Sequence, residues 1–390
     1  MTKLKVVLKL GKEKAILNRH HWIFSGAVAQ LPTFENGALL PVYSHGGALL
    51  GTAYFNRCST IVGRMIAFDE TAPLLAIEQR LQQAFDLRQT LFDPSITNAY
   101  RLINAEGDGL PGLIIDCYND VIVMQIATLG MEKLKSYVVK WLIDHLHPKV
   151  VYEKSESSSR QQEGLNAFSG LLFGSDLAPV EACENGLKFI IDFEHGQKTG
   201  FFCDQRQMRQ QVKALSAGKS ILNCFAYTGG FTVYALAGGA LQVDSVELSE
   251  QAMSFVKKNI NINCFDTSKA RFYEEDVFEF LRNNPLKYDL IILDPPAFAK
   301  KRGDIIPACR GYKDINRLAL KKMPARSWLL TCSCSHFIDE SLFQKVLFQA
   351  SIEAGRRVRI ISRHQMAQDH PINICHPESD YLKSFLLYVE

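Results

Sequence analysis

The chain has 390 residues, of which 47% are hydrophobic and 22% charged, a balance typical of globular proteins and unlike that of long disordered segments. This length predicts two or three domains. The net charge of +3 does not by itself indicate a nucleic-acid partner. No apolar run approaches the roughly 20 residues of a membrane-spanning helix, and the lysine-rich N-terminus lacks a signal-peptide core. We therefore expect a cytoplasmic protein that does not bind membranes.

The N-terminal half predicts two small domains. Glycines and short apolar runs such as 48–54 and 60–67 predict a β-barrel-like domain over residues 1–72. An α+β middle domain over 73–178 begins with a helix at Pro73–Leu91, because apolar residues recur there at helical spacing behind a proline. The polar run 155–160 is expected to be a loop. The other elements expected in this domain are strands at 100–103, 112–116, 121–127 and 150–153 and a helix at 131–146.

Strands and helices alternate in residues 179–390, which predicts a Rossmann-like α/β domain with a parallel sheet covered by helices on both faces. The expected strands are 221–225, 244–247, 270–273, 289–293, 327–331, 358–362 and 383–389. The expected helices are 231–237, 250–261, 278–283, 309–322 and 340–354.

Cysteine spacing and charge clusters bear on possible partners. The ten cysteines form no CxxC pair, so we expect no metal site and no disulfide framework. Two basic clusters could neutralise phosphates, although each is equally compatible with a solvated surface. They consist of Lys3, Lys5, Lys9, Lys12, Lys14 and Arg19, and of Lys300, Lys301, Arg302, Arg310, Lys313, Arg317, Lys321, Lys322 and Arg326.

A ligand site is expected at the end of the first strand of the α/β domain. Ligands of such sheets bind beyond the carboxyl ends of the strands, and Gly229-Gly230 lets the chain turn tightly there. Glu247, about 20 residues later at the next strand end, can accept hydrogen bonds from ribose hydroxyls. The GxGxxG pattern of dinucleotide sites is absent, which disfavours a nicotinamide oxidoreductase and favours an adenosyl ligand without phosphates. A turn without any ligand is the alternative.

Two further acids follow the third and fourth strands. Asp276 stands where it could face an adenine amino group, and Asp294 begins the rigid run Asp294-Pro-Pro-Ala-Phe298. Such a loop could hold a flipped base, with Phe298 available for stacking and Asp294 for an exocyclic amine or a ring nitrogen. Each acid alone is more often a turn or helix-cap residue.

The fifth strand ends in Thr331-Cys-Ser-Cys-Ser335, at the same sheet edge as Asp294. A thiolate that adds to carbon 6 of a pyrimidine makes carbon 5 nucleophilic enough to accept a methyl group. Strand alternation places Cys332 and Cys334 on the same side, so spacing does not choose between them. A buried, unreactive thiol is the alternative for either residue.

These motifs, in this order, resemble the bacterial 23S rRNA cytosine-5 methyltransferases that carry an N-terminal PUA domain. The resemblance covers nearly the whole chain. One departure is His20-His21 before Trp22, where the family has His-Pro-Trp. The matching stretches are Gly11–Gly26, Tyr100–Gly112, His195–Arg206, Leu222–Phe231, Asp294–Pro296, Cys309–Asn316 and Thr331–Ser335.

The resemblance implies a PUA-type RNA-binding domain, S-adenosylmethionine as methyl donor, and 5-methylcytosine in 23S ribosomal RNA as product. Cys334 is then the nucleophile, because it fills the second position of Ser-Cys-Ser, and Asp294 is the second catalytic residue. We expect a monomer or homodimer. The cofactor-binding residues expected are Thr199, Phe201, Asn223, Phe225, Tyr227, Thr228, Gly229, Glu247, Asp276, Asp294 and Pro295, and the RNA-binding residues are Lys9, Lys12, Arg19, Phe298, Arg310 and Lys313.

Two other functions remain open at this point. An RNA methyltransferase acting on the exocyclic amine of guanine (N2) or adenine (N6) would use the Asp-Pro-Pro run and would need no thiol. A non-catalytic RNA-binding factor could keep the cofactor fold without transferring methyl groups.

Overall fold

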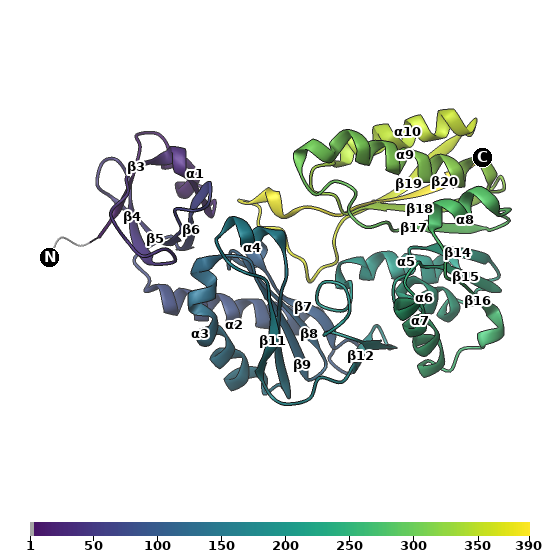
Figure 1. The fold of residues 1–390 in the computed structure, drawn as a ribbon, viewed down its shortest axis with the longest axis horizontal. Coiled ribbons are helices and arrows are strands. Elements are labelled where there is room, and N and C mark those ends of the chain that lie inside the picture. Colours follow the sequence, from purple (N-terminus) through teal and green to yellow (C-terminus); the bar gives the residue numbers. More distant parts are fainter. Residues whose placement is uncertain (1–3) are drawn as a thin grey trace. The chain divides into compact units, whose positions relative to one another are not determined.

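The computed structural model describes residues 4–390, so Lys3 of the first basic cluster lies outside the described residues. The chain forms two compact units, shown in Figure 1, and neither is one contiguous stretch. The first unit contains the chain through Cys183 together with Ile191–Phe201 and Gln368–Ser379. The second contains Glu184–Ile190, Phe202–Ala367 and Asp380–Glu390. The domain boundaries expected at residues 72 and 178 remain predictions.

The first unit begins with a six-stranded sheet in the order β2-β6-β5-β4-β1-β3. A glycine is required at Gly51, because its φ is +132° and a Cβ there would lie 2.0 Å from the carbonyl oxygen of Ala67. A short helix, α1 (Lys14–Leu17), precedes the second strand. The strands are β1 (Val6–Leu8), β2 (Trp22–Phe24), β3 (Val28–Gln30), β4 (Leu39–Tyr43), β5 (Leu49–Phe55) and β6 (Ile61–Ala67).

Beside this sheet, His21 is buried in its neutral form. Its side chain is almost fully enclosed, and Nδ1 lies 2.9 Å from the carbonyl oxygen of Met65, which can only accept, so Nδ1 carries the proton. Burial lowers the pKa of His21 to about 3. The unfolded chain therefore takes up a proton at this histidine near pH 6.5, whereas the folded chain does not.

We expect His21 to make the protein less stable as the pH falls below about 6.5, because the unfolded state then binds the extra proton. Between about pH 7.5 and about pH 5.5 this one group lowers the free energy of unfolding by about 1.4 kcal/mol. Urea unfolding of wild type and His21→Gln at both pH values measures the effect. The variant should lose about this much of the wild-type pH dependence, and an unchanged dependence would contradict the assignment.

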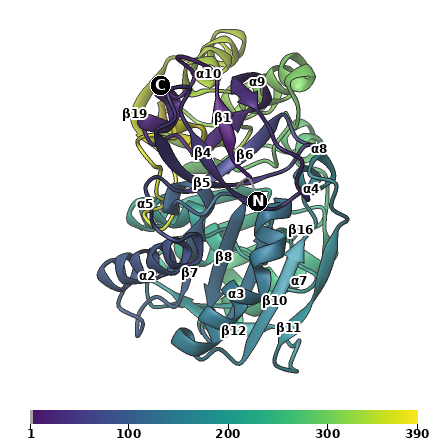
Figure 2. The same ribbon diagram turned by 90° about the vertical axis from the view of Figure 1, so that its left-hand side faces the viewer.

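The first unit also contains a five-stranded sheet in the order β11-β10-β9-β8-β7. Helices α2 (Pro73–Leu91) and α3 (Leu129–Leu146), labelled in Figure 2, share one apolar core with this sheet. The strands are β7 (Ala99–Asn104), β8 (Leu113–Tyr118), β9 (Val121–Ile126), β10 (Val150–Ser155) and β11 (Phe168–Phe173).

The prediction of a loop at 155–160 is wrong. Strand β10 extends through Ser155, and a short helix, α4 (Ser158–Gln162), follows it. Arg160 is buried there and donates 2.7 Å hydrogen bonds from Nε to the carbonyl of Asn166 and from Nη1 to that of Ile126. The Ile126 partner of Arg160 lies 34 residues earlier in the sequence, so local composition does not reveal this contact of the helix.

The second unit is built on a seven-stranded sheet in the order β16-β15-β14-β17-β18-β20-β19. Helices α5, α6 and α7 cover one face, and α8, α9 and α10 cover the other, each layer with its own apolar core (Figure 1). The strands are β14 (Ser220–Cys224), β15 (Gln242–Val246), β16 (Ala270–Tyr273), β17 (Leu290–Leu293), β18 (Ser327–Ser333), β19 (Val358–His364) and β20 (Lys383–Val389). The helices are α5 (Arg206–Leu215), α6 (Gly230–Ala237), α7 (Glu250–Ile262), α8 (Val277–Asn283), α9 (Ile305–Lys322) and α10 (Glu340–Ala354).

The expectation of a wholly parallel sheet is wrong at one edge, where β20 lies between β18 and β19 and runs antiparallel to both. A parallel neighbour needs a crossover connection, usually a helix. The connection from β19 to β20 contains no α-helix, so the chain returns in the opposite direction. A further pair of strands, β12 (Val180–Glu184) and β13 (Leu187–Ile191), forms a two-stranded sheet that was not predicted.

Within the second unit, Glu184 carries a fully buried carboxylate. Its oxygens accept hydrogen bonds from Arg209 Nε and Nη2 at 2.7 and 2.6 Å, from Arg206 Nε at 3.1 Å, and from the Tyr234 hydroxyl at 2.9 Å. The side chains of both arginines are also almost completely enclosed. The hydrogen bonds join the last residue of β12 to helices α5 and α6.

No helix within residues 4–390 is both long enough and apolar enough to cross a membrane.

Candidate cofactor and catalytic site

The loop between β14 and α6 is strained. Phe225 and Tyr227 have left-handed φ values of 60° and 48°, and Gly229 has one of 82°. A non-glycine residue in this region costs roughly 1–3 kcal/mol, and such residues gather at ligand-binding turns. Of the two glycines expected to be needed here, only Gly229 has a left-handed φ; a Cβ at Gly230 would instead meet the side chain of Arg209 at 3.1 Å.

Glu247, the residue after β15, fastens this loop. One carboxylate oxygen accepts the Tyr227 N–H at 2.9 Å, and the other accepts the Ser249 N–H at 3.0 Å. The side chain is half-buried. A carboxylate has about four acceptor positions, so two remain for hydroxyl donors such as those of a ribose.

The other predicted cofactor residues of the second unit have structural partners. Asn223 is fully buried and donates from Nδ2 to Thr232 Oγ1 at 2.9 Å, which ties α6 to the sheet. Thr228 is buried, and its carbonyl accepts from Asn259 Nδ2 at 2.8 Å. Asp276 is exposed and caps helix α8 by accepting the Glu279 N–H at 3.1 Å. Asp276 therefore acts as a helix cap, which is the role that the sequence offered as the alternative to adenine binding.

Thr199 and Phe201 belong to the first unit, unlike the other predicted cofactor residues. The Thr199 hydroxyl donates to Asp116 Oδ2 at 2.6 Å and lies 2.9 Å from the Tyr118 hydroxyl. The Phe201 carbonyl accepts from the same tyrosine hydroxyl at 3.2 Å. Both residues are thus anchored to β8.

Two loops at the carboxyl ends of β17 and β18 are tied together. Asp294 accepts from Gln205 Nε2 at 2.9 Å, which orients its carboxylate. The Cys334 thiol lies 3.8 Å from the carbonyl oxygen of Pro295, and the Ala299 N–H donates to Ser335 Oγ at 3.1 Å. The predicted association of Asp294-Pro295-Pro296 with the cysteine run is therefore present.

The two cysteines differ in their surroundings. Strand β18 ends at Ser333, so Cys334 lies just beyond it and is half-buried. Cys332 is fully enclosed in the core beside α5, α6 and α7. Burial raises the pKa of the Cys332 thiol well above its usual value. A buried thiol of this kind is inert, so the geometry favours Cys334 as a nucleophile.

Lys383 was missed by the sequence analysis. It is buried, and its Nζ donates to the carbonyl oxygens of Ser335 and Tyr381 at 2.8 and 2.7 Å. Burial lowers the pKa of this lysine to about 8, while Asp380, Cys334 and Asp339 act in the opposite direction. The only sign of it in the sequence is a lysine at the start of the apolar strand 383–389. The positive charge of Lys383 favours a thiolate at Cys334.

The predicted RNA-binding residues belong to both units, three to each. Phe298 packs its ring 4.5 Å from that of Tyr312, and Lys313 is ion-paired with Glu353 at 2.6 Å, so neither is freely presented. Arg310 and Lys12 are exposed. Lys9 and Arg19 are also exposed, and donate to the carbonyl oxygens of Gly26 and Phe68 at 2.9 and 3.4 Å.

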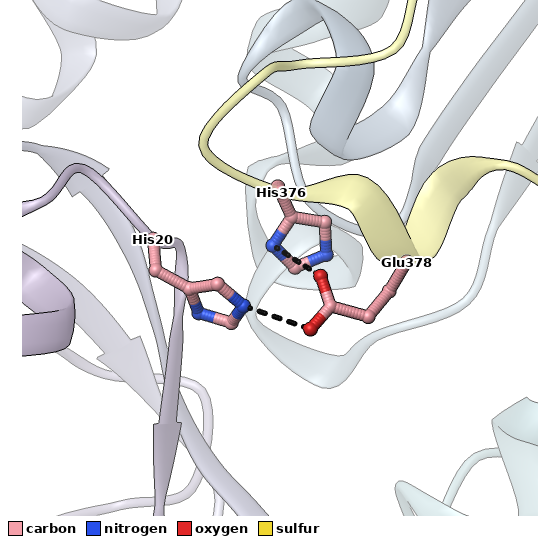
Figure 3. A group of neighbouring side chains, drawn as sticks. All are labelled: His20, His376 and Glu378. Carbon is pink, nitrogen blue, oxygen red and sulfur yellow. Dashed lines mark hydrogen bonds and ion pairs between the residues drawn. The ribbon is translucent and has the colours of Figure 1, made fainter.

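Figure 3 shows a group of side chains that could ligate a metal: His20, His376 and Glu378, whose ligand atoms lie within 4.8 Å of one another. Glu378 lies 3.2 Å from Nε2 of His20 and 3.8 Å from Nδ1 of His376. The Trp22 N–H donates to Nδ1 of His20 at 3.2 Å, so this ring carries its proton on Nε2, toward Glu378. A metal at Nε2 would have to replace that proton. A hydrogen bond accounts for the pairing of His20 with Glu378, whereas Nδ1 of His376 is buried without a hydrogen-bond partner among the described residues. The absence of a metal remains a prediction.

Comparisons with known proteins now decide the family. Residues 162–360 match the model of a family described as S-adenosylmethionine-dependent methyltransferase, and residues 6–68 match a PUA-like domain. The chain belongs to the S-adenosylmethionine-dependent methyltransferase family. Over 98% of both chains, the methyltransferase is 39% identical to the "Ribosomal RNA large subunit methyltransferase I" of Escherichia coli. It is 40% identical, at the same coverage, to the protein of that name from Aliivibrio fischeri.

Solved structures agree with this assignment. A structure described as a methyltransferase complexed with SAH is 26% identical, with a TM-score of 0.85 over 99% of this methyltransferase and 100% of that chain. The predicted α/β Rossmann-like domain, the PUA-like domain and the cofactor S-adenosylmethionine are confirmed. The side chains present fit this cofactor, because the half-buried Glu247 carboxylate keeps acceptor positions for ribose hydroxyls beside a strained loop.

Proposed function

We propose that this methyltransferase forms 5-methylcytosine in the 23S ribosomal RNA of the large subunit, through a covalent adduct with Cys334. The observation that carries the proposal is the half-buried Cys334 thiol, 3.8 Å from the Pro295 carbonyl in the loop that begins with Asp294. The names of the two relatives support ribosomal RNA as the substrate. Methylation of carbon 5 is inferred from the thiol and its surroundings.

S-adenosylmethionine, when bound, supplies a methyl group on a positively charged sulfur. We assign Glu247 to its ribose hydroxyls, and Asp276, whose second oxygen is not needed for the helix cap, to the adenine amino group. The remaining residues assigned to the cofactor pocket are Thr199, Phe201, Asn223, Phe225, Tyr227, Thr228, Gly229, Asp294 and Pro295.

The proposed chemistry uses three side chains. The Cys334 thiolate forms a bond to carbon 6 of cytosine, and the electron pair of the 5,6 double bond becomes available at carbon 5. After carbon 5 has gained the methyl group, a base removes its proton and the carbon–sulfur bond breaks, which restores the double bond and the thiolate. Lys383 favours the thiolate, and Asp294, held by Gln205, accepts from the exocyclic amine of the base.

A second candidate function is methylation of an exocyclic amine, guanine N2 or adenine N6. The oriented Asp294 carboxylate in the Asp-Pro-Pro loop suits such an amine equally well. This reaction leaves Cys334 without a role.

Product analysis tests the proposed function. The protein is incubated with methyl-labelled S-adenosylmethionine and unmodified 23S ribosomal RNA, and the digested nucleosides are separated. We expect the label in 5-methylcytidine. Label in N2-methylguanosine or N6-methyladenosine would replace the proposal by the second candidate. RNA binding without any label would identify a non-catalytic RNA-binding factor.

A further inference from the structure

The first unit contains a cavity of about 430 Å³ that the proposed chemistry does not use. Segments distant in the sequence converge on it: the first sheet, helix α2, the turn after β7 and the C-terminal excursion 368–379. The turn belongs to Tyr100–Gly112, one of the stretches in which the sequence resembles the methyltransferase family. The lining residues that carry the argument are Arg19, Phe68, Asp69, Arg80, Gln83, Asp108 and Gly109.

Two arginines point their guanidinium groups toward one ring in this cavity. Arg19 lies 5.4 Å and Arg80 5.9 Å from the centre of the Phe68 ring. Arg80 also donates to the carbonyl oxygen of Gly109 at 2.7 Å. Burial lowers the pKa of Arg80, Asp69 raises it, and the nearby Arg19 lowers it again, but an arginine remains charged at neutral pH. Two cations are therefore held close together in a partly desolvated place.

The charges around the cavity do not cancel. Asp108 is occupied by a bidentate ion pair with Arg88, at 2.6 and 2.8 Å. His21, which interacts electrostatically with Arg80, is neutral. Asp69 therefore faces both Arg19 and Arg80, which leaves one positive charge in excess. A phosphodiester group carries one negative charge, and planar guanidinium groups match its oxygens in geometry.

The backbone makes room for this arrangement. Gly109 has a φ of +71°, and a Cβ there would lie 2.0 Å from Nη1 of Arg80. Any other residue would displace the guanidinium. Arg19 itself has a left-handed φ of 64°, which is uncommon for a residue with a side chain. The turn therefore fixes where the Arg80 guanidinium lies, and the Arg19 backbone is held in an uncommon conformation beside it.

We propose that this cavity binds a phosphodiester group of the RNA substrate, with Arg19 and Arg80 as its ligands. The inference rests on the proposed function for the identity of the polymer, and it assigns a backbone contact rather than a base contact. The site therefore anchors RNA without reading its sequence.

Filter binding to the whole protein tests this proposal. The probe is a short transcript of 23S ribosomal RNA, the tightest binder of a tiled set, at a series of KCl concentrations. We expect Arg19→Gln/Arg80→Gln to weaken binding at least about tenfold and to reduce the slope of log affinity against log salt by roughly 0.7–0.9 per lost phosphate contact. The matched control is Arg57→Gln, an exposed arginine 4.1 Å above the Phe34 ring and outside the cavity.

A second pair of variants guards against loss of folding. Gln83 and Gln89 are both exposed on α2, but only Gln83 lines the cavity. Gln83→Glu should weaken RNA binding by repelling the phosphate, whereas Gln89→Glu adds the same charge without that effect. SAH binding should be unchanged in both. Equal weakening by the cavity variants and their controls would overturn the proposal.

Inorganic phosphate separates a free ion from RNA as the ligand. If phosphate stabilises wild type against heat but not Arg19→Gln/Arg80→Gln, and RNA affinity is the same for both, the cavity holds an ion only and the proposal fails. The product analysis is independent of these measurements. A protein that needs the cavity for RNA but makes no 5-methylcytidine would overturn the proposed function and keep this inference.

Discussion

Replacement of Cys334 by alanine is expected to lower the rate of methyl transfer to RNA on the order of a thousandfold or more. Carbon 5 of cytosine is a poor nucleophile until a thiolate has added to carbon 6, and the half-buried Cys334 lies at the Asp294 loop. Single-turnover rates with labelled cofactor measure the effect, and SAH binding shows that the variant is folded.

Cys332→Ala is the matched control, because Cys332 is buried in the core and two residues away. It should keep methylation within a few fold of wild type. RNA containing 5-fluorocytidine adds a direct observation: fluorine at carbon 5 cannot leave as a proton does, so wild type should remain bound covalently and Cys334→Ala should not. A fully active Cys334→Ala protein, or a covalent complex lost only in Cys332→Ala, would refute the assignment.

The second large effect concerns stability rather than chemistry. Glu184→Ala is expected to lower the free energy of unfolding of the second unit by about 3–5 kcal/mol. Glu184 is fully buried between Arg206 and Arg209, and its removal leaves two enclosed guanidinium groups without their carboxylate. The Tyr234 hydroxyl also loses an acceptor. Urea unfolding followed by circular dichroism measures the change.

Glu353 supplies the comparison for this measurement. Its side chain is 44% exposed and forms an ion pair with Lys313. Surface ion pairs contribute at most about 1 kcal/mol, so Glu353→Ala should shift the unfolding midpoint only slightly. If Glu184→Ala has no larger effect than Glu353→Ala, the buried network does not stabilise the unit.

Elements with a strong local signal were predictable. The helices Pro73–Leu91 and Glu340–Ala354 and the strands Ala270–Tyr273 and Lys383–Val389 have the bounds that periodicity predicted. Strand β11 was missed because its apolar residues do not alternate with polar ones, and most of its side chains are exposed along an edge of the sheet. The direction of β20 was missed because an apolar run carries no information about orientation.

The candidate site was predictable in outline only. Acids and a cysteine at strand ends could be placed together, because parallel strands bring their carboxyl ends to one edge. The choice between Cys332 and Cys334 depends on where β18 ends and on burial, and neither follows from alternation. The partner of Thr199 is Asp116, 83 residues earlier, a pairing that no local pattern contains.

The interleaving of the two units has a consequence for inheritance. The first unit needs Thr199 for Asp116 and needs Asp369, whose carboxylate accepts the Arg101 N–H at 2.9 Å. Thr199 and Asp369 lie in segments of the first unit that follow segments of the second unit in the sequence. A gene segment ending near residue 178 would lack them, so a single crossover at that point would deprive the first unit of both hydrogen-bond partners. Exchange of the whole first unit between lineages is therefore expected to require the gene segment of the second unit as well.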